Sequence, residues 1–146
     1  MDIDQFLRTG AINAILGNSD APLFKDNNYL FYDYEMGRVY FPWDLDTVMR
    51  QDVDVLAGGV GGQVDFYTDV MYSNWKDQYI AIVSEMVGTK LPLNAINNEI
   101  DDIVGVAGTA LEADTYLDGT ASGAAASLSG WWSTRFAQIN ADLAAQ

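Results

Sequence analysis

The sequence contains no cysteine and no histidine among its 146 residues. Without cysteine the chain can form neither disulfides nor thiolate metal sites. Without histidine it lacks the commonest general base, the serine-type catalytic triad and the usual zinc ligands. Any chemistry must therefore depend on carboxylates, amides, hydroxyls and a metal ion that prefers oxygen ligands.

Basic residues are scarce: 7 lysines and arginines stand against 21 aspartates and glutamates, for a formal net charge of −14. Such a surface repels phosphate backbones, so we expect no nucleic-acid partner. It attracts divalent cations, although solubility alone is also a sufficient reason for it. No apolar run approaches the roughly 18 residues of a membrane span, so we expect no membrane insertion. Met1 is followed by acidic rather than basic residues, so we expect no signal peptide within these residues.

The rest of the composition is that of a folded domain. Hydrophobic residues make up 49% of the chain and aromatic residues 12%, which argues against disorder. A chain of this length can bury a core as a single domain, so we expect one domain over residues 1–146.

The pattern of apolar residues predicts a first helix near the N-terminus. Asp2 is a suitable N-cap, and Gly17 suits the C-terminal stop just before Asn18. The residues at helical spacing, which we expect to be buried, are Phe6, Leu7, Ala11, Ala14 and Ile15.

A β-hairpin is predicted next, because residues 28–46 read NYLFYDYEMGRVYFPWDLD, with two aromatic-rich runs around EMG. We expect strands over residues 29–34 and 38–41, and a three-residue loop in which Gly37 takes the positive φ.

The expected register brings polar residues together at the open end of this hairpin. If Tyr34 pairs with Arg38, paired residue numbers sum to 72, and Asn28 faces Asp44. An antiparallel hairpin brings its two open ends together, so we expect Asn28, Asp44 and Asp46 to converge there.

The remainder of the chain predicts three further helices. Residues 50–64 contain GGVGG, which we interpret as a flexible loop, since it lacks the lysine and hydroxyl of a phosphate-binding P-loop. Helices are expected from about residue 65 to Gly88, over 93–111, and after GTASGAAAS, which we interpret as a linker. Their expected inward residues are Trp75, Tyr79, Ile82, Val83, Met86, Ile96, Ile100, Ile103, Val104, Ala107, Leu128, Trp132, Phe136, Ile139 and Leu143. The expected fold class is α+β and mostly α, with one aromatic β-hairpin packed on about four helices.

Four polar residues interrupt apolar surroundings in the first third of the chain: Asp20, Asn28, Asp44 and Asp46. Three carboxylates and an amide suit a magnesium site. They also suit phosphoryl transfer, in which one aspartate orients the attacking hydroxyl while an asparagine and another aspartate hold the metal on the phosphates. Structural roles are the alternative: Asp20 can cap a turn, Asn28 can end a strand, and Asp44 and Asp46 can be solvated or cap a short helix.

The run IDQFLRTGAINAILGNSD, followed by NNYLFYDYEMGRVYFPWDLD, resembles the CotH kinase family of spore-coat protein kinases and their relatives. The matching pieces are an Asn-x-Asp element (18–20), an asparagine that opens an aromatic strand, and a Pro-Trp-Asp-x-Asp element (42–46). A Trp-x-x-Arg helix (132–135) is also similar. The resemblance is strong over residues 1–49 and looser towards the end of the chain.

This resemblance implies an atypical protein-kinase-like fold and the transfer of the ATP γ-phosphate to protein hydroxyls with Mg²⁺ or Mn²⁺. It implies that Asp20 is the catalytic aspartate, and that Asn28 and Asp44 bind the metal and through it the nucleotide. Asp46 is a second-choice metal ligand. The implied partners are ATP and a protein substrate, and the implied location is extracellular or at the cell or spore surface.

The sequence also departs from a complete kinase. The aspartate and asparagine are 28 − 20 = 8 residues apart, whereas ordinary kinases have five. Only nineteen residues precede Asp20, too few for the nucleotide-covering lobe and its lysine. We therefore expect the C-terminal part of such a domain, with the catalytic and metal segment at 1–49, the glycine-rich loop at 50–64 and the helical part at 65–146. This part would associate with an absent N-terminal lobe.

Two other functions are open on the sequence alone. One is a non-catalytic cell-surface or spore-coat module, used for interaction or structure, that keeps the same fold. The other is a plain Ca²⁺-binding domain, which ranks last because the EF-hand pattern D-x-[DN]-x-[DN]-G does not occur.

Overall fold

The structure is a computed structural model. The residues that it describes are 2–18, 29–35, 37–42, 45, 48–49, 55–56, 66–116 and 119–146.

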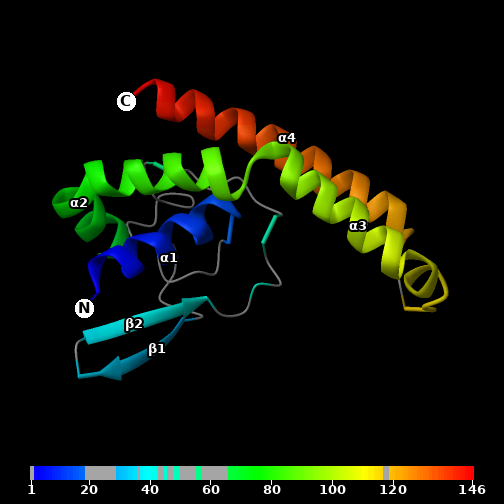
Figure 1. The fold of residues 1–146 in the computed structure, drawn as a ribbon, viewed down its shortest axis with the longest axis horizontal. Coiled ribbons are helices and arrows are strands. Elements are labelled where there is room, and N and C mark those ends of the chain that lie inside the picture. Colours follow the sequence, from blue (N-terminus) through cyan, green and yellow to red (C-terminus); the bar gives the residue numbers. More distant parts are fainter. Residues whose placement is uncertain are drawn as a thin grey trace.

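Helices dominate the described part of the chain, and the mostly helical class expected from the sequence is confirmed (Figure 1). One two-stranded sheet accompanies them. The elements in chain order are α1 (Ile3–Ile15), β1 (Tyr29–Tyr34), β2 (Gly37–Pro42), α2 (Phe66–Glu85), the π-helical turn η2 (Met86–Lys90), α3 (Leu93–Glu112) and α4 (Ala121–Ala144).

Helix α1 forms as its capping and spacing signals predict. The side chain of Asp2 accepts a hydrogen bond from the backbone N–H of Gln5 at 3.0 Å, which satisfies one of the free donors of the first turn. Asp4 adds negative charge at the positive end of the helix dipole. All five residues expected at the inner face are buried.

The hairpin forms, but its register differs by one residue from the expected one. Tyr34 pairs with Gly37, and Arg38 pairs with Asp33. The cause is a two-residue loop in place of three, which is the commonest length for a hairpin. Gly37, with φ 151, begins β2 instead of lying in the loop. The shift removes the reason for placing Asn28 opposite Asp44, and both of these residues lie outside the described part of the chain.

Helix α2 ends at Glu85, but helical conformation continues through η2 to Lys90, two residues beyond the end expected at Gly88. Its last turn widens into η2, in which the N–H of Leu91 bonds the carbonyl of Met86 at 2.8 Å. Gly88 lies inside this turn, because a glycine weakens a helix without ending it. The helix ends just before Pro92, which lacks an N–H and cannot continue the bonding pattern.

Helix α4 begins within the segment expected to be a linker. Thr120 caps it by accepting a hydrogen bond from the N–H of Gly123 at 3.0 Å. The Glu112 carboxylate, at the end of α3, accepts another from the N–H of Ala121 at 2.8 Å. The small-residue string is therefore mostly helical, because alanine has the highest helix propensity and a threonine stands where a cap is needed.

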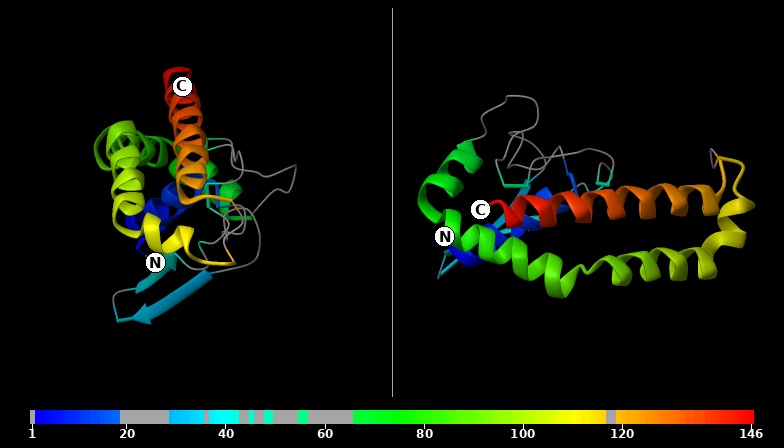
Figure 2. Two further views of the ribbon diagram at one scale, coloured as in Figure 1. Left: turned by 90° about the vertical axis from the view of Figure 1, so that its right-hand side faces the viewer. Right: turned by 90° about the horizontal axis from the view of Figure 1, so that it is seen from above.

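Helices α3 and α4 run side by side and project beyond the body formed by α1 and α2 (Figure 2). Among the described residues, little covers the projecting part. The prediction that two of its residues face inward is therefore wrong. Ile103 is 54% exposed and Leu128 is 36% exposed. Ile100 is buried as expected, and Ile96, Val104 and Ala107 are partly buried.

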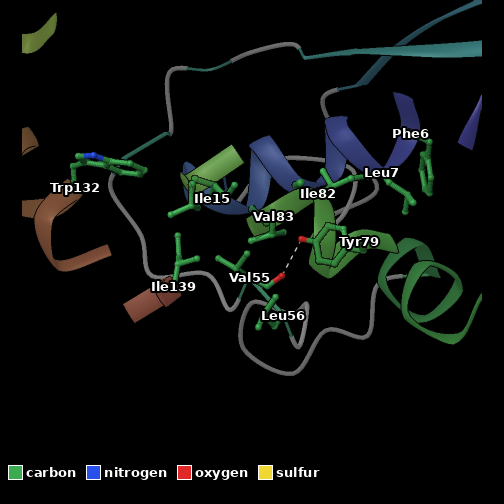
Figure 3. Close-up of a cluster of buried hydrophobic side chains, with 13 residues drawn as sticks. Phe6, Leu7, Ile15, Val55, Leu56, Tyr79, Ile82, Val83, Trp132 and Ile139 are labelled. Carbon is green, nitrogen blue, oxygen red and sulfur yellow. Dashed lines mark hydrogen bonds between the residues drawn. The ribbon is translucent and has the colours of Figure 1, made fainter. Parts of the chain in front are cut away.

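The core joins α1, α2 and the C-terminal half of α4 (Figure 3). Its large members include Leu7, Tyr79 and Trp132. Val55 and Leu56, from the segment expected to be a flexible loop, also belong to it, and the Tyr79 hydroxyl donates to the Val55 carbonyl at 2.9 Å. Among the described helices, none is long and apolar enough to cross a membrane.

Candidate functional site at the end of α1

The four residues predicted to carry the chemistry, Asp20, Asn28, Asp44 and Asp46, all lie outside the described residues. Their roles stay predictions. The structure does describe the segments from which they continue: the end of α1 as far as Asn18, the hairpin between Tyr29 and Pro42, and the pair Val48 and Met49.

The end of α1 has a Schellman geometry. Gly17 adopts φ 63, the left-handed conformation that glycine takes without a steric penalty. The N–H of Gly17 bonds the carbonyl of Ala14 at 3.0 Å, and the N–H of Asn18 bonds the carbonyl of Asn13 at 2.9 Å. This 5→2 and 6→1 pair is the Schellman pattern. The direction in which the chain leaves α1 towards Asp20 is therefore fixed as far as Asn18.

Two carbonyls at this end need partners from elsewhere in the chain. The first is that of Ile15, a residue with no exposed surface. It accepts from Nε of Arg135 at 3.2 Å, while another guanidinium nitrogen of Arg135 donates to the carbonyl of Ala14 at 2.7 Å. The second is the carbonyl of Leu16, which accepts from the N–H of Met49 at 2.7 Å.

Arg135 is a functional candidate that reasoning from the sequence missed as such. It is 1% exposed and enters the core from α4. Its positive charge stands at the C-terminal end of α1, where a helix dipole favours a cation. The sequence does indicate that Arg135 is buried. It comes three residues after Trp132 and four before Ile139, so it shares their buried face.

A buried amide pair supports the same turn. Nδ2 of Asn18 donates to Oδ1 of Asn13 at 2.9 Å, and Nδ2 of Asn13 donates to the carbonyl of Thr9 at 2.8 Å. Both asparagines are nearly inaccessible to water, at 4% exposed for Asn13 and none for Asn18. Buried amides of this kind specify one arrangement, because any other leaves polar groups unpaired. Asn18, the first residue of the Asn-x-Asp element, thus has a structural role.

Met49 joins the segment after the hairpin to the end of α1. Its N–H is the donor to Leu16, its side chain packs against the core, and its φ is 58. A positive φ costs a non-glycine residue free energy and persists only where the surroundings enforce it. In the sequence, Asp20 follows Leu16 by four residues and Asp46 precedes Met49 by three. This one hydrogen bond therefore connects the two stretches of chain that lead to candidate carboxylates.

Near the middle of α1, Arg8 connects this helix to α2. Its guanidinium bonds the carboxylates of Asp4 at 2.8 Å and Glu85 at 3.0 Å. These hydrogen bonds raise the pKa of Arg8 above its ordinary value, and the bond to Asp4 has the largest effect. Both of these ion pairs are exposed, so water and salt screen them. Within the described residues, no group of three carboxylates is placed to hold a metal ion.

Comparison with known proteins gives one match. The family described as CotH kinase protein matches residues 1–139, a range that includes the four candidate residues and Arg135. A search of curated proteins and a search of solved structures found no match.

Proposed function

The chain belongs to the CotH kinase family, and we propose that it takes part in transferring the γ-phosphate of ATP to a protein hydroxyl with Mg²⁺ or Mn²⁺. In this reaction the hydroxyl oxygen forms the new P–O bond, the bond between the β and γ phosphates breaks, and ADP leaves. Asp20 orients the hydroxyl and accepts its proton. Asn28 and Asp44 would hold the metal, with Asp46 as a further ligand, and the metal would supply positive charge to the phosphates.

The observation that carries this proposal is the hydrogen bond between Met49 and Leu16, at 2.7 Å. It ties the stretch after Asp44 and Asp46 to the stretch before Asp20. The pairing of Tyr29 with Pro42 adds that the chain enters and leaves the hairpin at one end. Two chain segments that lead to the predicted groups thus start from a common, partly buried anchor.

The donor chemistry also supports it. Phosphoryl transfer depends on positioning and on neutralising charge, and a bound divalent ion supplies the neutralisation. Amide and carboxylate oxygens are the protein ligands that Mg²⁺ prefers. An aspartate is sufficient to orient a hydroxyl, so the absence of histidine is no obstacle.

A second function is favoured by the projecting part of α3 and α4. Val106 on α3 is 90% exposed and Tyr116, four residues after α3, is 94% exposed, and we take these two apolar side chains as the candidate contacts with another protein. In this alternative the chain is a surface or spore-coat module that uses the fold for interaction or structure. For both functions we propose a location outside the cell, at the cell or spore surface, as the family suggests.

The test is a thermal-shift titration with Mn²⁺, ATP, or both, on the wild-type chain and on Asp44→Ala. Asp102→Ala is the matched control, because it removes an equal charge from an exposed position on α3. At a ligand concentration 100 times Kd, binding stabilises the folded state by about 2.7 kcal/mol, which raises Tm by roughly 5–10 °C for a chain of this size.

We expect a shift that needs both ligands, is absent in Asp44→Ala and is intact in Asp102→Ala. The absence of such a shift in the wild-type chain, or equal loss in both variants, would contradict the proposal and favour the interaction module.

A further inference from the structure

We propose that Arg135 is a positioning residue for Asp20: from α4 it fixes the end of α1 and so sets the course of the chain towards the candidate catalytic carboxylate. The inference rests on the proposed function for the role of Asp20. Its structural basis, the contact of Arg135 with two carbonyls of α1, is independent of that function.

The hydrogen bonds at the end of α1 show what Arg135 contributes. The carbonyls of residues 12, 13, 14 and 16 each accept from a backbone N–H, supplied by Leu16, Asn18, Gly17 and Met49 in turn. Only the carbonyl of Ile15 is left without a backbone donor among the described residues. It is fully buried, and a buried carbonyl without a partner is destabilising. Nε of Arg135 satisfies it.

Arginine is particularly suited to this position. Its planar guanidinium presents several donors in a fixed arrangement, whereas lysine is a compact charge on a flexible stem. Two nitrogens of Arg135 reach two successive carbonyls, those of Ala14 and Ile15. This double contact fixes the orientation of the last turn of α1 as well as its position.

The effect on Asp20 follows from the sequence distance. Asp20 is five residues from Ile15 and two from Asn18, and the intervening turn is held by buried hydrogen bonds. Loosening its anchor shifts the chain on which Asp20 is carried, and a displacement of about 1 Å in a reacting group can cost roughly 100-fold in rate. Asn28 and Asp44 adjoin the hairpin, and the segment after it bonds the end of α1 through Met49 and Leu16, so binding of the metal and nucleotide depends less directly on Arg135.

The experiment compares Arg135→Lys and Arg135→Met with Arg8→Met. The control removes a cation and a tie between helices from the middle of the same α1, seven residues before Ile15. Two quantities are measured on each folded protein. The first is hydrogen exchange at the backbone amides of residues 16–18, by NMR. The second is the transfer of labelled γ-phosphate from ATP to itself or to dephosphorylated casein, giving kcat and the KM for ATP.

We expect both Arg135 variants to exchange at least tenfold faster at residues 16–18 and to lose roughly 10- to 100-fold in kcat, with KM for ATP changed less than threefold. The lysine variant keeps the charge. It should therefore retain more of the protection from exchange at residues 16–18, and more of kcat, than the methionine variant. Arg8→Met should leave exchange at residues 16–18 and kcat unchanged.

Several results would overturn the inference. Unchanged exchange at residues 16–18 would show that Arg135 does not fix the turn. Faster exchange with normal kcat would show that the turn does not position Asp20, and a rise in KM with normal kcat would assign Arg135 to nucleotide binding. If neither variant folds, Arg135 serves the whole core and has no specific positioning role. Failure of the proposed function is separate, because it appears as a wild-type chain that neither binds Mn²⁺–ATP nor transfers phosphate.

Discussion

Replacing Gly17 with alanine measures how much stability depends on the left-handed turn at the end of α1. With φ 63, this position costs a residue that carries a Cβ about 1–2 kcal/mol. Alanine also lowers the conformational entropy of the unfolded chain, and this stabilises the folded state by about 0.4–1 kcal/mol relative to glycine. We therefore expect Gly17→Ala to lower the free energy of unfolding by about 1 kcal/mol.

The matched control for this change is Gly105→Ala in α3. Gly105 lies inside a helix, and a Cβ added there meets no atom within 4 Å. Alanine is the better helix former, so the same substitution should raise the free energy of unfolding by about 0.5–1 kcal/mol. The two variants carry the same chemical change and are expected to shift stability in opposite directions.

Urea unfolding followed by circular dichroism measures both effects. The slope of the free energy against urea should be common to both variants and the wild-type chain, since none of them changes the surface exposed on unfolding by much. In thermal unfolding followed by the same signal, the Tm values of Gly17→Ala and Gly105→Ala should differ by roughly 4–8 °C for a chain of this size. If Gly17→Ala is neutral or stabilising while Gly105→Ala behaves as expected, the turn is not left-handed, and the argument that it directs the chain towards Asp20 fails with it.

Two further predictions concern the core and the reaction. Tyr79→Phe removes the donor to the buried carbonyl of Val55 and should lower the free energy of unfolding by about 1–3 kcal/mol; in urea unfolding, a change below a few tenths would contradict that contact. Asp20→Ala should abolish phosphate transfer from labelled ATP while the thermal shift with Mn²⁺ and ATP persists, since we propose that this residue orients the hydroxyl and does not hold the metal. Loss of both in Asp20→Ala would make Asp20 a ligand instead.

The sequence predicted best those features that depend on local signals. The cap at Asp2, the stop at Gly17 and the buried face of α1 were all correct because each is set by residues within one or two turns. The hairpin was correct as an element, but its register was not, since loops of two and three residues are both compatible with EMG. Locally, the string GTASGAAAS is consistent with a linker and with a capped helix, and only the contact with α3 decides between them.

Predictions that depend on distant parts of the chain were weaker. Ile103 was expected to be buried because its spacing is helical, yet its side chain is 54% exposed among the described residues. The spacing of Arg135 places it on a buried face, but its role was missed because its partners are backbone carbonyls of a helix near the other end of the chain, and those leave no pattern in a sequence. The roles of Asp20, Asn28, Asp44 and Asp46 rest on spacing and family resemblance and stay predictions.

The link between Arg135 and α1 also bears on how the protein is made. The guanidinium and the carbonyl of Ile15 are 120 residues apart in the chain, so a ribosome must synthesise nearly all of this sequence before they can meet. Synthesis proceeds at about 5–20 residues per second, so α1 lacks this donor for at least several seconds after its own synthesis. The turn before Asp20 is thus completed among the last parts of the fold, and a nascent chain that stops short of α4 lacks the donor that closes it.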